Sequence, residues 1–79
     1  MIDTSNQRPI QVLTPESAGP YLRIPLSQLE QVRELLRVND ISHWVAHQAI
    51  SVNGRPAVIV VNLSKKTDPV RVQELLDAA

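Results

Sequence analysis

Hydrophobic residues recur at helical spacing in two segments of the chain. In the first, Ser27-Gln28-Leu29-Glu30 fits a capping box, in which the Ser hydroxyl and the Glu carboxylate each accept a hydrogen bond from a free backbone N–H group. Asn39 tolerates the left-handed backbone conformation that often ends a helix. The pattern therefore predicts a helix between Ser27 and Asn39. Its apolar face consists of Leu29, Val32, Leu35 and Leu36.

The second helical segment follows Thr67. Asp68 is a suitable N-cap residue, because its carboxylate can accept hydrogen bonds from the first free N–H groups of a helix. Pro69 suits the first helical position, where no backbone N–H is needed. The apolar face of this helix consists of Val72, Leu75, Leu76 and Ala79.

Alternating apolar and polar residues predict strands. Tyr21–Ile24 is one such segment, and two longer runs flank Asn53-Gly54. This dipeptide favours a type I′ turn of two residues, which would join the two runs into a hairpin. The turn also sets the register of the hairpin and places Trp44 opposite Leu63.

Because side chains alternate between the two faces of a sheet, this register divides the hairpin residues into two sets. The set expected in the core is Trp44, Ala46, Ile50, Val52, Ala57, Ile59, Val61 and Leu63. The opposite set contains an apolar patch of Val45, Ala49, Val58 and Val60, edged by His43, His47, Ser51 and Asn62.

The predicted element order is (β)βαββα, an α+β layout of the ferredoxin-like type. It would have an antiparallel sheet of three or four strands with two helices on one face. Tyr21–Ile24 would pair with Ala57–Leu63, and Ile10–Leu13 is the candidate for a fourth strand. We expect residues 1–9 to be a disordered tail and residues 10–79 to be a single domain.

Composition and charge narrow the function. Eight basic and eight acidic residues give a net charge of zero, and aromatic residues make up 3% of the chain. A nucleic-acid-binding domain normally has a basic excess or a base-stacking platform, so we expect no nucleic-acid partner. The longest apolar run, 57–61, is too short to span a bilayer, and residues 1–8 are polar. We therefore expect a cytoplasmic protein that does not bind a membrane.

The layout also resembles known domains. The run from Tyr21 to Glu30, the helix end leading into Ile41, and Val60-Val61-Asn62-Leu63 carry this resemblance. Over residues 21–78 the pattern is similar to small bacterial signal-transducing domains and, more loosely, to amino-acid-sensing regulatory domains of ferredoxin-like shape. The resemblance implies a regulatory role and assigns no catalytic residue. The sensors usually have a Gly-bearing loop where this chain has Pro25-Leu26-Ser27, which argues against ligand binding there.

His43 and His47 are the two histidines of the chain. Their spacing would suit Zn²⁺ on a helix, but four strand residues span about 13 Å, too far for one metal ion. The chain has no Cys and no nucleophile elbow, P-loop or dinucleotide fingerprint. We therefore predict no metal site, no cofactor and no catalytic residues; an enzyme that uses one of these histidines is the least favoured hypothesis.

Two candidate binding regions remain. Lys65, Lys66 and Thr67 precede the second helix, where free N–H groups and two ammonium groups could hold an anion. The apolar patch on the open sheet face is the second region, since contiguous apolar surface usually marks a contact. Its candidate interface residues are Val45, His47, Ala49, Val58 and Val60.

The favoured function is a small non-catalytic interaction or regulatory module that associates with itself, or with an unidentified protein, through the open sheet face. The alternative is a sensor domain for a small ligand, either an anion or a metabolite. An exposed sheet face and a solvated loop are the structural explanations that compete with these two binding regions.

Overall fold

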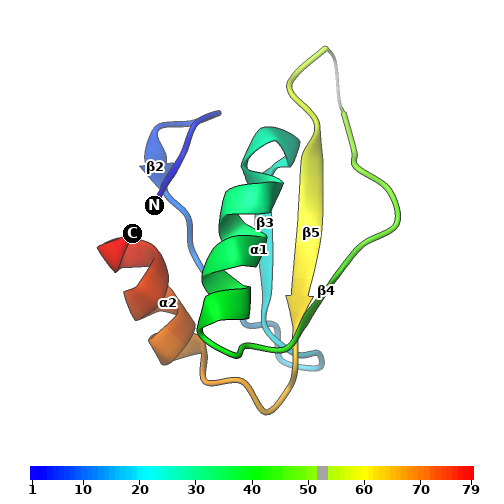
Figure 1. Cartoon of the computed structure of the whole chain (residues 1–79). Coiled ribbons are helices and arrows are strands. Elements are labelled where there is room, and N and C mark those ends of the chain that lie inside the picture. Colours follow the sequence, from blue (N-terminus) through cyan, green and yellow to red (C-terminus); the bar gives the residue numbers. More distant parts are fainter. Residues whose placement is uncertain (52–53) are drawn as a thin grey trace.

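The α+β class predicted from the sequence is confirmed. The computed structural model describes residues 1–51 and 54–79, in which two helices accompany antiparallel sheets of two and three strands (Figure 1). The strands are β1 Ile2–Asp3, β2 Arg8–Pro9, β3 Tyr21–Pro25, β4 His43–Val45 and β5 Val58–Leu63. The helices are α1 Leu29–Val38, which follows the 3₁₀ turn η1 Leu26–Gln28, and α2 Pro69–Ala78.

β5 is the central strand of the larger sheet and runs antiparallel to both β3 and β4. Leu22 lies opposite Val61, and Ile24 lies opposite Ile59. The predicted pairing of these two segments is therefore confirmed. α1 connects β3 to β4, and β5 lies between the two strands that the helix joins.

One face of this sheet forms the hydrophobic core together with both helices. Side chains directly opposite one another on neighbouring strands point to the same face, so β3 and β5 present their buried residues together. The helices add their apolar faces to that side. The buried cluster consists of Ile10, Leu22, Ile24, Val32, Leu36, Ile41, Ile59, Val61, Leu63, Val72 and Leu76.

The way in which α1 ends sets the direction of the chain that follows it. Asp40 has a positive φ of 56°, the Asp40 N–H donates to the Arg37 carbonyl at 3.2 Å, and the Ile41 N–H donates to the Leu36 carbonyl at 2.9 Å. These two bonds form a Schellman motif, in which the residue after the left-handed position packs against the last turn. Ile41 and Leu36 are both buried, as the motif requires.

This motif also explains why Trp44 is not in the core. Ile41 points inward, so alternation carries His43 and Val45 to the core face and Trp44 to the opposite face. In the observed register Trp44 lies opposite Asn62, and His43 lies opposite Leu63. The side chain of Trp44 is 58% exposed. The prediction of a buried Trp44 was wrong, because a register slip of one residue exchanges the two faces of a strand.

The rest of the predicted hairpin also differs from the two-residue turn model. Ile50 bridges Val58 rather than Ala57, and Ile50 is exposed. The chain between Val45 and Ile50 therefore has two more residues than the facing part of β5, so regular pairing stops at Val45. Gly54 has the positive φ expected of it, at 72°. Val52 and Asn53, and with them the predicted turn type, lie outside the described residues.

The start of α1 lacks the predicted capping box. Backbone pairing continues to Leu26, whose N–H donates to the Ala57 carbonyl at 2.9 Å. The chain then enters η1 directly from Pro25, and neither η1 nor α1 has a side-chain hydrogen bond at its N-cap. Ser27 therefore lies inside the 3₁₀ turn and caps neither helix. At α2 the prediction is confirmed, since the Asp68 carboxylate accepts from the Val70 N–H at 2.9 Å and Pro69 is the first helical residue.

Residues 1–9, expected to be a disordered tail, instead form the β1–β2 hairpin. The buried amide of Gln28 donates to the Ile2 carbonyl at 2.7 Å and accepts from the Thr4 N–H at 2.9 Å. The Met1 nitrogen contacts the Leu76 carbonyl, which places the hairpin beside the end of α2 (Figure 1). Composition alone could not reveal these partners, because they lie 24 to 75 residues away in the sequence.

Residues 10–13 do not form a fourth strand. Leu13 makes a single bridge to Tyr21, while Ile10 is buried in the core. The Gln73 side chain of α2 accepts from the Val12 N–H at 2.9 Å and donates to the Ile10 carbonyl at 3.0 Å. An amide side chain thus supplies the hydrogen bonds that a neighbouring strand would otherwise provide.

Candidate interaction surface on the open sheet face

The face of the larger sheet opposite the core carries a contiguous set of partly exposed residues. We call this surface the open face. β5 supplies its central row, and β3 and β4 supply the two sides. Its residues are Tyr21, Arg23, Trp44, Ile50, Val58, Val60 and Asn62.

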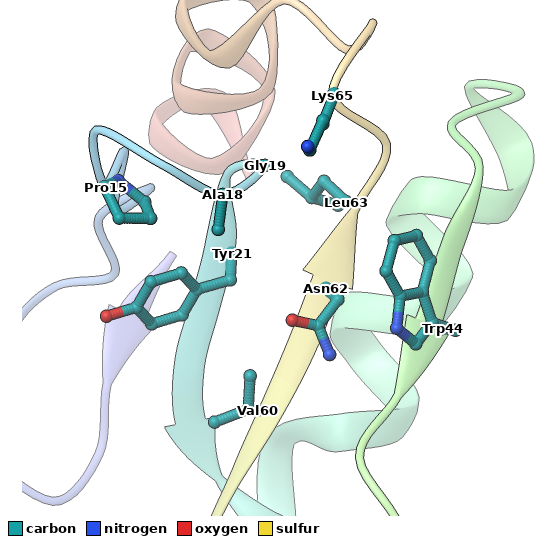
Figure 2. A pocket seen from close by; sticks show the side chains of 9 residues that line it. All are labelled: Pro15, Ala18, Gly19, Tyr21, Trp44, Val60, Asn62, Leu63 and Lys65. Atoms are coloured by element: carbon teal, nitrogen blue, oxygen red, sulfur yellow. The ribbon is translucent and has the colours of Figure 1, made fainter.

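The Tyr and the Trp of this chain lie in one row of the open face. Asn62 pairs with Tyr21 on one side and with Trp44 on the other, so the row crosses all three strands. Figure 2 shows Val60 and Asn62 between the two aromatic residues. The Tyr21 ring extends away from β5 and so broadens this surface. On the other side of β5, Trp44 of β4 lies beside Asn62.

A pocket of about 480 Å³ opens on this row, and we call it the Trp44 pocket. Tyr21, Trp44 and Val60 line it from the sheet, together with Asn62. Pro15 and Ala18 line it from the loop before β3, and Lys65 from the segment after β5 (Figure 2). The pocket is therefore mostly apolar, with one amide and one ammonium group.

Gly19 allows this pocket to have its shape. A Cβ atom at position 19 would lie 2.9 Å from the Leu63 carbonyl oxygen and 3.2 Å from Cγ of Lys65. The loop before β3 therefore packs directly against the end of β5, and the aliphatic part of the Lys65 side chain lies beside Gly19. Lys65 lines the end of the Trp44 pocket next to this close approach.

A second pocket, of about 600 Å³, lies further along the same face. We call it the Arg23 pocket. Arg23, Ile50 and Val58 line it from the open face, Arg55 from the segment before β5, and Asp3 from the β1–β2 hairpin. Val58 and Val60 are two residues apart on β5, so the two pockets follow one another along that strand.

Charge is unevenly distributed between the two sides of the molecule. Six of the eight acidic residues belong to the helices or their ends, namely Glu30, Glu34, Asp40, Asp68, Glu74 and Asp77. The residues of the open face include a cation, Arg23, and no carboxylate. Among the described residues, no carboxylate lies within ion-pair distance of Arg23 or Lys65. The open face itself therefore has a cation and no carboxylate, although Asp3 lines the Arg23 pocket and the helices also carry Arg33, Arg37 and Arg71.

Three of the five predicted interface residues have a different environment from that expected. Val58 and Val60 are half-buried on the open face, where alternation placed them. Val45 instead packs against the core, because β4 has the opposite phase. His47 and Ala49 are exposed in the irregular segment after β4.

The sequence did not reveal that Tyr21, Trp44 and Lys65 line one pocket. Tyr21 could have been found, since it precedes Leu22 in an alternating strand and must point away from the core. Trp44 could not, because its phase depends on the Schellman motif at the end of α1.

The three residues of the predicted anion site are not brought together. Lys65 lines the Trp44 pocket, whereas Lys66 and Thr67 line a separate hollow with Asp40 and Asp68. Asp68 caps the first turn of α2, and the Lys66 N–H donates to the Ser64 hydroxyl. In that hollow the two carboxylates are matched by two cations, Lys66 and Arg71, so it has no cationic excess to favour an anion.

His43 also lies away from the open face, on the core side of β4. His43 is half-buried, and its Nδ1 lies 3.0 Å from the Ile41 carbonyl; because a carbonyl only accepts, Nδ1 is the donor. Within residues 1–51 and 54–79 no cluster of His, Cys, Asp or Glu side chains could hold a metal ion. On α1, hydrogen bonds and Coulomb attraction from Glu34 raise the pKa of Arg37, an exposed pair remote from the open face.

Comparisons of the chain with protein-family models, with curated proteins and with solved structures found no match. The resemblance to signal-transducing domains therefore rests on the residue pattern alone. None of the helices in the described part of the chain is long and apolar enough to cross a membrane.

Proposed function

We propose that this chain is a non-catalytic interaction module that contacts another protein, either a second copy of itself or a partner, through the open face. The exposed Trp44 beside half-buried Val60 is the observation that carries this proposal. Trp is among the residues most enriched at the energetic centres of interfaces, because it buries a large area at low conformational entropy cost.

The surroundings of Trp44 support the same interpretation. The open face has apolar residues on all three strands, and neither helix covers it because both contribute to the core on the other side. Isolated apolar residues on a surface are common, but contiguous ones usually mark a contact. The strand order β3-β5-β4 also fits a ferredoxin-like domain without its last strand, an arrangement that would leave this face open.

The test is a single charge placed at the centre of the face. Val60→Lys should convert an assembled form to monomer, or abolish partner retention, in native mass spectrometry of protein purified from its own host. The matched control is Val38→Lys, which changes an exposed Val on α1. Circular dichroism should show both variants folded. If assembly and partner retention survive Val60→Lys unchanged, the proposal fails.

A small-ligand sensor is the second candidate, favoured by one observation. Lys65 stands at the end of a mostly apolar pocket of about 480 Å³, a volume within the range of small-molecule sites. An aromatic carboxylate would fit that chemistry. A thermal-shift screen with amino acids, nucleotides and aromatic acids at millimolar concentration tests it, and the absence of any shift would remove this candidate.

A further inference from the structure

We infer that the open face receives an extended acidic peptide segment of a partner protein, which places a proline or aromatic side chain in the Trp44 pocket and directs carboxylates toward Lys65 and Arg23. This inference rests on the interaction module proposed above and specifies its partner. Three observations carry it: the line of the two pockets, the chemistry of the first, and the distribution of charge.

The two pockets lie along one strand, which suits an extended ligand. The Trp44 pocket includes Val60 and Asn62, and the Arg23 pocket includes Val58. From Val58 to Asn62, β5 spans about 13 Å at the usual rise per residue, which is the length of four to five residues of extended chain. A small metabolite would occupy one pocket and leave the other unused.

The Trp44 pocket has the lining of a peptide groove. An aromatic side chain next to apolar residues accommodates proline or another ring, and this is how domains that recognise proline-rich segments bind them. The Asn62 amide can donate to and accept from a peptide backbone, since it carries both kinds of group. Lys65 can then pair with a carboxylate that follows the buried ring.

Charge distinguishes an acidic partner from the other occupants. Two copies joined through their open faces would offer Arg23 and Lys65 of each copy no carboxylate from the open face of the other. Nucleic acid would meet few cations on a molecule of zero net charge that carries six carboxylates on its helical side. A peptide with a few carboxylates matches the small number of cations along β5.

The experiment uses the full chain and two arrayed sets of fluorescein-labelled ten-residue peptides. In both sets a proline, phenylalanine or tyrosine lies at the centre, flanked by glutamates in one set and by lysines in the other. Fluorescence polarisation should detect binding of members of the glutamate set and of none of the lysine set. Labelled oligothymidylate of ten nucleotides should not bind.

Variants locate the binding on the open face. Trp44→Ala should lower the affinity for the tightest-binding peptide at least tenfold, and Lys65→Ala should lower it several-fold. Lys66→Ala is the matched control, because Lys66 is the next residue but lines a different hollow. The Lys66→Ala variant should bind the same peptide with the affinity of the unmodified chain. Equal loss in Lys65→Ala and Lys66→Ala would overturn the inference, as would binding of both peptide sets or of the oligonucleotide.

The outcomes separate this inference from the proposal beneath it. If no peptide binds but Val60→Lys disrupts an assembly, the interaction module stands and the acidic peptide is overturned. If no peptide binds and Val60→Lys changes nothing, both fail. Peptide binding that is lost in both Trp44→Ala and Val60→Lys supports both.

Discussion

Asp40 ends α1 in a backbone conformation that an L-residue adopts at a cost. Its φ is 56°, a region that glycine occupies freely. Its negative charge also lies at the C-terminal end of the helix, where the dipole favours cations. Asp40→Gly should therefore raise the free energy of unfolding by about 0.5–1 kcal/mol in urea denaturation.

Asp40→Asn is the control for charge, since Asn tolerates the left-handed region as well as Asp does. It should give a smaller gain than Gly. A glycine variant no more stable than the Asn variant would show that the backbone at position 40 is not strained.

Gly19 is a second residue at which a single added atom, a Cβ, should change the stability of the fold. A Cβ there would come within 2.9 Å of the Leu63 carbonyl oxygen, a backbone atom that cannot rotate away. Gly19→Ala should lower the free energy of unfolding by about 1–3 kcal/mol, as overpacking does elsewhere. The variant should also disturb the Trp44 pocket, which the same loop lines.

Ser17→Ala, in the exposed part of the same loop, is the comparison for Gly19 and should change stability by less than about 0.5 kcal/mol. Urea denaturation of both variants gives the result. Equal stability of Gly19→Ala and Ser17→Ala would contradict the close packing of the loop against β5.

At the scale of elements, two glutamines hold the N-terminal segment to the helices. Gln28 satisfies the backbone of the β1–β2 hairpin, and Gln73 satisfies Ile10 and Val12. Removing a side chain that serves two backbone groups leaves both without a partner. This makes the hairpin dependent on contacts outside itself, as expected for strands of two residues each.

Gln28→Ala should therefore lower the free energy of unfolding by about 1–3 kcal/mol, because it leaves a donor and an acceptor unsatisfied. Hydrogen exchange should accelerate at the Thr4 amide before it changes in α1. Gln31→Ala, at an exposed position of α1, is the control and should be nearly neutral. If protection at Thr4 is unchanged in Gln28→Ala, the hairpin does not depend on this amide.

At the scale of the whole molecule, the helical side and the open face differ in charge and polarity. The helical side carries most of the carboxylates, and the open face carries apolar residues with cations. Because the chain contains one Trp, and that Trp lies on the open face, its fluorescence reports on whatever covers this surface.

Dilute protein should therefore emit near the wavelength of exposed tryptophan, shift little on unfolding, and be quenched efficiently by iodide. Emission should move to shorter wavelength only when a ligand or a second copy covers Trp44. A strongly blue-shifted emission from dilute monomer that moves red on unfolding would place Trp44 in the core, contrary to the structure.

Much of the fold was predictable from local signals. Val72, Leu76 and the Asp68 cap identified α2, and alternation on β5 correctly separated Ile59 and Val61 from Val58 and Val60. For the candidate site, the same alternation correctly predicted that Val58 and Val60 face away from the core. It placed Trp44 on the wrong face, because the assumed two-residue turn set the wrong register for β4.

The sequence by itself determined the two helices, the three main strands and the buried face of β5, because periodicity, and at α2 the Asp68 cap, act between residues within a few positions of one another. Only the tertiary structure decided which way β4 faces and where the N-terminal segment lies. The first depends on the burial of Ile41 in the core, and the second on Gln28 and Gln73 meeting backbone groups far away in the sequence. Both the core and these hydrogen bonds exist only after the helices have packed on the sheet, so neither composition nor spacing records them.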